Sequence, residues 1–320
     1  MTTAPLDRPA VVAAAERYLS QPRPIFTRLP VPYRIVPLPV RTRLLKLIAA
    51  GRKREGGFPA WPIERSLDQD VVFPGYDGRR AAMLITHDID STPELAAIRG
   101  IRDWERDLGL VASFGFVPRV SWPPEDTARA LVAEGCEVYV HDLAHNGRLP
   151  YQPRDAIRAA FRRLFDASPW AAALMRTFRA GQLLCSPELV DVVAEFFAVD
   201  MSIPDSERDG PYGDQAGAGT VFPFKLRGLL EIPVTMPQEV FLRQVYGLSA
   251  DATLGIWREK LTYIKERGGV ASLNVHPVWL ERDAELARVL RTLFTELARD
   301  DDLLVTTPSR LATLLGTDQT

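Results

Sequence analysis

Histidine and cysteine are scarce in this chain of 320 residues, which has four histidines and two cysteines. Cys136 and Cys185 are far apart in sequence and form no CxxC pattern, so they offer neither a disulfide framework nor a thiolate metal site. This cysteine usage is typical of a protein in a reducing compartment. The net charge of −2 gives no indication of a nucleic-acid partner.

Long apolar runs are missing as well. The sequence has no stretch of 18 apolar residues that could span a membrane, and its first residues lack the basic and apolar regions of a signal peptide. Hydrophobic residues make up 46% of the chain, the share typical of a soluble globular protein. We therefore expect a cytoplasmic protein with no integral membrane segment.

Residues 1–75 differ from the remainder of the chain. Prolines recur between residues 22 and 39, which interrupts regular structure. One helix with a basic polar face is predicted over residues 41–55, where it either packs on the main domain or contacts a membrane surface or a partner. We expect an N-terminal extension of residues 1–75 that packs on a main domain of residues 76–320.

From about residue 80, short β-rich runs alternate with helical patterns. The expected strands cover residues 82–86, 111–117, 137–140, 177–179, 197–199, 230–234, 271–275 and 303–306. The expected helices cover residues 92–109, 123–135, 154–167, 186–197, 250–269 and 283–300. This alternation predicts an α/β fold with a parallel sheet, most simply a (β/α) barrel.

Polar residues of catalytic type gather where the expected strands end. They are His87, Asp88, Asp90, His141, His145, Arg179, Asp200 and His276, and they include all four histidines. In a barrel, the loops at the C-terminal ends of the strands carry the chemistry. One shared rim therefore accounts for these residues better than separate structural roles do.

The pair His141 and His145 has three interpretations when taken alone. The two residues could be unrelated surface histidines, or they could form the His-x-x-x-His pair of a zinc-binding helix. That helical motif needs Glu after the first histidine, whereas Asp142 follows here and the preceding residues are strand-like. One turn after a strand would also bring the two imidazoles together.

Two histidines and one carboxylate leave coordination positions open for water and substrate, which is typical of a catalytic zinc. The same set of ligands also suits Fe(II) oxygenases. A second carboxylate can serve as general base, an arginine can keep that base ionised, and a further histidine can protonate a leaving group. These additional groups favour a hydrolase, and the usual all-β fold of such oxygenases conflicts with the α/β alternation.

In these residues the sequence resembles the polysaccharide deacetylase superfamily, which has the NodB-homology or carbohydrate esterase family 4 fold. Five motifs of that family are matched in order over about residues 80–310. They are a TFDDG or SFDVD type at 86–90, H-(S/T)-x-x-H at 141–145, an arginine motif at 178–181, a DSS-like segment at 200–204 and LxxH at 273–276. The resemblance implies a distorted (β/α)7-8 barrel of the NodB/deacetylase type, preceded here by the N-terminal extension.

The resemblance also implies a role for each matched residue. Asp88 would be the catalytic base, with Arg179 orienting and ionising it, and His276 would be the general acid, tuned by Asp200; Asp90, His141 and His145 would be metal ligands. The expected cofactor is a divalent metal, Zn2+ first, with Co2+, Mn2+, Ni2+ or Fe2+ as alternatives.

Some positions depart from the family pattern. His87 replaces the usual aromatic residue and is either a polar group of the pocket or a packed ring. Asp142 replaces a hydroxyl residue that braces the metal loop, and its carboxylate could accept the same backbone hydrogen bonds. Three roles stay open for residues 1–75: capping the site, shaping specificity or forming a homo-oligomer interface.

The resemblance implies that metal-activated water attacks an acyl carbonyl, most often that of an acetyl group, and that a free amine is released. The expected substrate is a small-molecule or carrier-linked acylated amine: an amino sugar, sugar nucleotide, lipid-linked sugar or natural-product intermediate. Two alternatives stay open. One is an allantoinase-like C–N hydrolase acting on a non-sugar amide, and the other is a non-catalytic binding protein that retains the fold.

Overall fold

The structure is a computed structural model that describes residues 6–28, 40, 43, 44, 46, 47, 66–69, 71, 73, 75–206 and 217–317. Nine strands form one central sheet in this part of the chain. They are β1 (Ala81–Ile89), β2 (Ser113–Phe116), β3 (Glu137–His141), β4 (Thr177–Arg179), β5 (Val199–Asp200), β6 (Phe224–Leu226), β7 (Leu229–Glu231), β8 (Val270–Asn274) and β9 (Leu303–Thr306). Their order is β6-β7-β5-β4-β3-β2-β1-β8, and β9 also pairs with β1.

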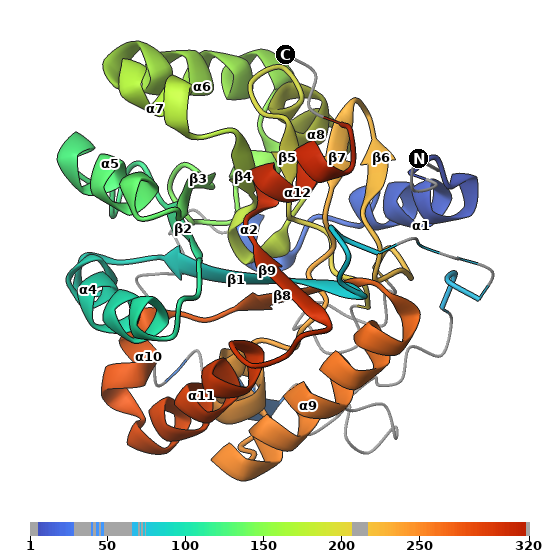
Figure 1. Ribbon diagram of the computed structural model, residues 1–320. Helices are drawn as coiled ribbons and strands as arrows, with labels where there is room; N and C mark the ends of the chain where they lie inside the picture. The colour runs from blue at the N-terminus through green and yellow to red at the C-terminus, as the bar shows by residue number, and fades with distance from the viewer. Residues whose placement is uncertain are drawn as a thin grey trace.

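The sheet is almost entirely parallel and is curled into a half-barrel (Figure 1). The only antiparallel pair among the described strands is the hairpin of β6 and β7. Beyond β7 the chain turns back toward β8, where the Met236 amide donates to the Ser272 carbonyl at 3.1 Å. The predicted α/β fold with a distorted barrel is confirmed in this form.

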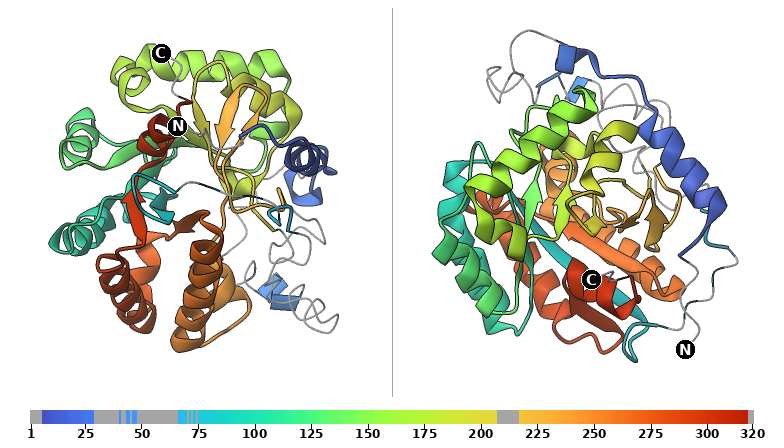
Figure 2. Two further views of the ribbon diagram at one scale, coloured as in Figure 1. Left: turned by 45° about the vertical axis from the view of Figure 1, so that its right-hand side comes forward. Right: turned by 90° about the horizontal axis from the view of Figure 1, so that it is seen from above.

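Helices cover the outside of the curled sheet, as the two views in Figure 2 show. They are α4 (Thr92–Asp107), α5 (Glu125–Ala133), α6 (Arg154–Ala167), α7 (Pro169–Leu174), α8 (Pro187–Val193), α9 (Ala250–Arg267), α10 (Pro277–Arg282), α11 (Ala284–Leu297) and α12 (Pro308–Leu314). In α11, Leu286, Val289, Leu290, Leu293 and Leu297 recur at intervals of three or four and are buried. This spacing forms one apolar stripe that packs toward the sheet.

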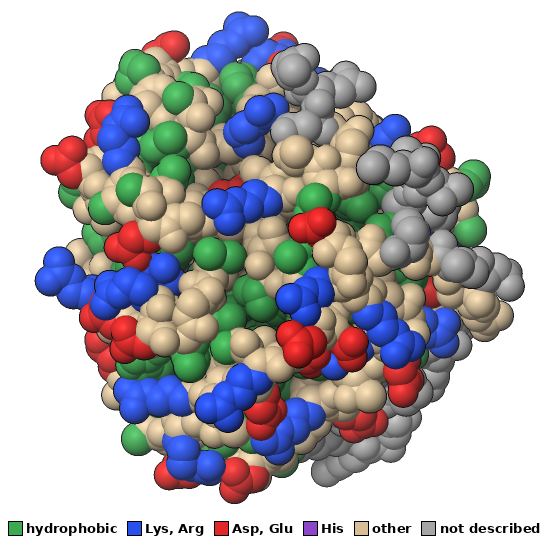
Figure 3. All heavy atoms as spheres, in the orientation of Figure 1, with side chains coloured by type: hydrophobic (Ala, Val, Ile, Leu, Met, Phe, Trp, Pro, Cys, Tyr) green, Lys and Arg blue, Asp and Glu red, His purple; other side chains and the backbone are tan. Residues whose placement is uncertain are grey.

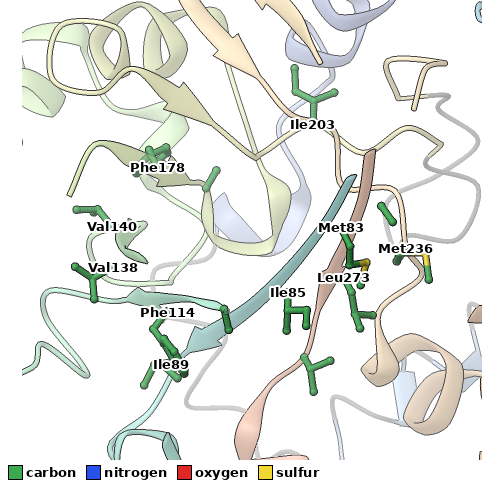
Figure 4. Packing of buried hydrophobic residues seen from close by; sticks show 14 of the residues in the cluster. Met83, Ile85, Ile89, Phe114, Val138, Val140, Phe178, Ile203, Met236 and Leu273 are labelled. Carbon is green, nitrogen blue, oxygen red and sulfur yellow. The ribbon is translucent and has the colours of Figure 1, made fainter. Parts of the chain in front are cut away.

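Alternation along β1 and β3 decides which side chains face the interior of the curl. Met83, Ile85 and Ile89 pack on the helix side together with Val138 and Val140 (Figure 4). Successive side chains of a strand point to opposite faces, so the intervening residues of β1 and β3 face inward. Asp88 and His141 lie on that inner face, near the C-terminal end of the sheet, whereas His87 shares the helix side with Ile85 and Ile89.

Strand β1 is the most enclosed element because it pairs with β2, β8 and β9, and all nine of its residues are buried. Its register places Asp88 opposite Gly115 of β2, and Thr86 opposite Asn274 of β8. Asp88, and Asp90 directly after the strand, are therefore positioned by a strand that pairs with other strands on both of its edges.

The N-terminal region contains elements that the sequence did not predict. Helices α1 (Pro9–Leu19) and α2 (Ile25–Arg28) lie in its first part. The helix predicted over residues 41–55 falls mostly outside the described residues, although residues 43, 44, 46 and 47 are helical. None of the described helices is long and apolar enough to cross a membrane.

Charges of both signs are intermingled on the face shown in Figure 3. Lysine and arginine side chains alternate there with aspartate and glutamate, as the small net charge of −2 predicts. On this face the described residues form no continuous basic surface of the kind that binds a nucleic-acid backbone.

Candidate functional site

The structure brings the three predicted metal ligands together. Asp90 follows β1, His141 ends β3, and His145 lies in the loop after β3. His141 Nε2 is 3.2 Å from Asp90 Oδ1, and His145 Nε2 is 3.3 Å from Asp90 Oδ2. One ligand atom from each residue lies within 4.8 Å of the other two, so one ion could contact all three.

Backbone contacts fix the orientation of His141. Its Nδ1 lies 3.1 Å from the Arg179 carbonyl oxygen, which also accepts the Asp142 amide at 2.9 Å. A carbonyl can only accept, so Nδ1 carries a proton, which leaves Nε2, on the side of Asp90, as the nitrogen that could bind a metal. This is the usual arrangement of a metal-binding histidine and its backbone partner. The donor set therefore fits a divalent metal such as zinc.

The loop that carries His145 adopts an uncommon backbone conformation. Asp142 has a φ of 57° and His145 a φ of 47°, both in the left-handed region. The Asp142 carboxylate accepts the amides of Leu143 at 2.5 Å and Ala144 at 3.5 Å. These contacts agree with the backbone-bracing role predicted for a carboxylate at this position.

Asp88 is surrounded by hydrogen-bond donors. Tyr139 donates its hydroxyl at 2.5 Å, Arg179 donates Nη1 at 3.1 Å and Asn274 donates Nδ2 at 2.7 Å. Burial opposes the charge on Asp88, but the charges of His141, Arg179 and His276 outweigh it and lower its pKa to about 2. The predicted contact between Asp88 and Arg179 is present.

His276 is held by a carboxylate that the sequence analysis missed. Glu239 Oε1 accepts both the backbone amide of His276 at 2.9 Å and its Nδ1 at 2.7 Å. Burial alone would lower the pKa of His276, but Glu239 and Asp90 raise it to about 10. The Nε2 atom of His276 lies 3.8 Å from Asp90 Oδ2, so the histidine faces the proposed metal ligands.

The predicted contact between Asp200 and His276 is not found in the described part of the chain, and Glu239 has that place instead. Asp200 is buried and accepts the hydroxyl of Ser202. Burial raises its pKa to about 6, and it also raises the pKa of the neighbouring Glu231 well above the ordinary value. Asp200 therefore belongs to a buried acid pair on β5 and β7, near Arg179 but away from His276.

His87 is fully buried, which agrees with a packed ring and excludes an open polar pocket position. Its ring centroid lies 5.1 Å from that of Phe114. Its Nε2 is 2.7 Å from Glu105 Oε1, and its Nδ1 is 2.9 Å from the carbonyl oxygen of Val275. His87 thus joins β1 to helix α4 and to the residue before His276.

Comparison with solved structures defines the class of fold. A Mycobacterium smegmatis protein described as a polysaccharide deacetylase superimposes with a TM-score of 0.62 at 20% identity, over 77% of this chain and 93% of the other. PuuE allantoinase gives a TM-score of 0.61 at 13% identity, over 81% and 98%. A Pseudomonas aeruginosa PAO1 protein, also described as a polysaccharide deacetylase, gives 0.58 at 13% identity, over 75% and 92%.

This chain therefore has the fold that polysaccharide deacetylases and allantoinase share, and the expected NodB-type architecture is confirmed. At these sequence identities the similarity shows only the fold, and any activity has to be argued from the residues of the site. No sequence-family model matches the chain, and no curated protein matches it in sequence.

Proposed function

We propose that this protein is a divalent-metal-dependent amide hydrolase that removes an acyl group, most simply acetyl, from an amine. The observation that carries the proposal is the group formed by Asp90, His141 and His145 beside a second carboxylate. Asp88 Oδ2 lies 3.6 Å from His141 Nε2, so a base and the ligand set share one space. The deacetylase-type fold supports the same class of reaction.

A divalent metal bound by Asp90, His141 and His145 would supply Lewis-acid activation of a water molecule and of the acyl carbonyl. Asp88 accepts the proton of the attacking water, and Tyr139 and Asn274 hold its carboxylate in place.

His276 donates a proton to the departing amine. Its Nδ1 is engaged by Glu239, so its Nε2 is the nitrogen directed at the site. Glu239 also supplies the negative charge that favours the protonated imidazole before the transfer. Arg179 acts as a positioning residue for the base, because it contacts Asp88 directly.

The proposed substrate is an acylated amino sugar or a related carrier-linked or small-molecule amine. A second candidate is ring opening of a small cyclic amide. It is favoured by the similarity to PuuE allantoinase, whose chain is covered to 98%. Both reactions break a C–N bond of an amide.

The test combines metal analysis with a screen for amine release from N-acyl sugars, nucleotide-linked amino sugars and cyclic amides, with added Zn2+ or Co2+. His141→Ala should lose the metal, whereas Asp88→Ala should keep it and lose turnover. A wild-type protein that takes up no divalent metal would contradict the proposal. Full activity of Asp88→Ala would show that the base is another residue.

A further inference from the structure

The first helix of the N-terminal region packs on the barrel. Val11, Ala15, Tyr18 and Leu19 of α1 are buried and belong to the main hydrophobic core. On the exposed side of the helix, Glu16 forms an ion pair with Arg227 at 2.8 Å. Helix α1 is therefore fixed relative to the sheet at several points.

One residue of α1 reaches the loop that follows β4. The Tyr18 hydroxyl donates a hydrogen bond to the Leu183 carbonyl at 2.7 Å. Gln182 and Leu183 have φ values of 59° and 56°, in the left-handed region that non-glycine residues rarely adopt. Such a conformation costs about 1–3 kcal/mol per residue and persists only where surrounding contacts impose it. Tyr18 supplies one of these contacts from outside the barrel.

The loop held by Tyr18 packs directly on the loop of the proposed metal ligands. Gly181 begins the short helical turn η3 (Gly181–Leu183) after Arg179. A Cβ atom at Gly181 would lie 3.0 Å from His145 Cδ2 and closer still to the Asp142 carboxylate. The two loops therefore touch without room for a methyl group, and a shift of one displaces the other.

Local backbone preference does not by itself favour the conformation of the proposed ligand loop, because Asp142 and His145 are also left-handed. Three segments are therefore in contact in sequence. Tyr18 of α1 contacts the turn that begins at Gly181, and this turn contacts His145 in the proposed ligand loop.

We infer that Tyr18 is a positioning residue for the metal site, and that helix α1 thereby helps to hold that site. The inference rests on the proposed function, because it assumes that His145 binds a metal. It assigns to the N-terminal extension a role in holding ligand geometry, which differs from capping the site or forming an oligomer.

The test uses the full chain, stripped of metal and titrated with Co2+, whose visible absorption reports coordination geometry. Tyr18→Phe keeps the buried ring and removes the hydroxyl that donates to Leu183. We expect Co2+ affinity to fall by about tenfold and the absorption band to change, since partners that orient metal ligands usually have effects of this size.

Glu16→Gln is the matched control, because it breaks a contact of the same helix with Arg227 and leaves the β4 loop untouched. It should bind Co2+ like the wild type. A Tyr18→Phe protein with wild-type affinity and spectrum would overturn the inference while leaving the proposed function intact. A wild-type protein that binds no Co2+ would instead remove the proposed function.

A second variant approaches the contact from the other side. Gly181→Ala introduces a methyl group against His145 and Asp142 without touching Tyr18. It should weaken Co2+ binding. If Tyr18→Phe does not fold, this variant tests whether the turn at Gly181 and the loop of His145 are coupled. Unchanged Co2+ affinity in Gly181→Ala would show that the two loops are not coupled, and the inference would fail.

Discussion

The replacement His87→Phe tests how the core around β1 tolerates a buried charge. His87 and Glu105 are both fully buried, and their side chains are 2.7 Å apart. Phenylalanine fills a similar space and is the kind of residue that the deacetylase motif usually has here. It cannot pair with Glu105, however, and it cannot donate to the Val275 carbonyl.

The expected loss of stability follows from these contacts. Leaving the buried Glu105 carboxylate without this hydrogen-bond partner costs about 3 kcal/mol, and the lost donor to Val275 adds about 1 kcal/mol. Arg102 Nη1 lies 3.6 Å from the other oxygen of Glu105 and compensates part of the stranded charge. We therefore expect a net destabilisation of about 3 kcal/mol.

A double replacement separates the charge from the packing. His87→Phe with Glu105→Leu removes the buried carboxylate as well, and stability should return to within about 1.5 kcal/mol of the wild type. Urea unfolding at pH 7, followed by both tryptophan fluorescence and circular dichroism, gives the free energies if the two transitions coincide. A single variant that loses less than about 1 kcal/mol, or a double variant as unstable as the single one, would refute this account.

Three further replacements probe other buried groups. Because burial raises the pKa of Asp200 from 3.8 to about 6, the folded state holds this proton more tightly than the unfolded state, and stability falls as the pH rises through that window. Asp200→Asn should therefore match the wild type near pH 4 and exceed it by about 2–3 kcal/mol at pH 7 in urea unfolding, and equal stability at pH 7 would contradict this. Lys260→Met removes the partner that Asp205 contacts at 2.5 Å and should cost about 3–5 kcal/mol by thermal unfolding, with a smaller loss counting against a buried pair. Glu239→Gln should bind Co2+ like the wild type but lower the rate of amine release by about tenfold or more, because His276 loses its charged partner; a wild-type rate would remove Glu239 from the site.

The positions of the strands could be predicted because β-rich runs and helical patterns alternate clearly after residue 80. Segment 177–179 was predicted with the bounds that β4 has, although it is only three residues long. Strand β6 could not be found, because Lys225 in its middle is exposed and the strand lies in a hairpin outside the alternation. Helix α1 was hidden in a region whose prolines suggested irregular structure.

Some of the site residues lie close in sequence to a predicted site residue, and others reach the site only through the tertiary fold. Tyr139 and Asn274 were not predicted, although each stands two positions before a predicted site histidine, where strand alternation puts it on the same face. Glu239 carries no such signal, because it lies at the N-terminus of the short helix Val240–Val245 and meets His276 only through the tertiary fold. A carboxylate that depends on a contact across 37 positions cannot be found by pattern alone.

The enclosure of β1 has a consequence for the order in which the protein is assembled. The Thr86 hydroxyl on β1 donates a hydrogen bond to the Leu273 carbonyl, 187 positions away. Asp88 accepts a hydrogen bond from the side chain of Asn274, 186 positions away. On the ribosome, β1, β2 and β3 are complete long before β8 exists, so one edge of β1 stays open through most of synthesis. Contacts of such long range slow folding, and an open strand edge invites pairing with other chains. We therefore expect the nascent chain to depend on chaperones until its last third has been made.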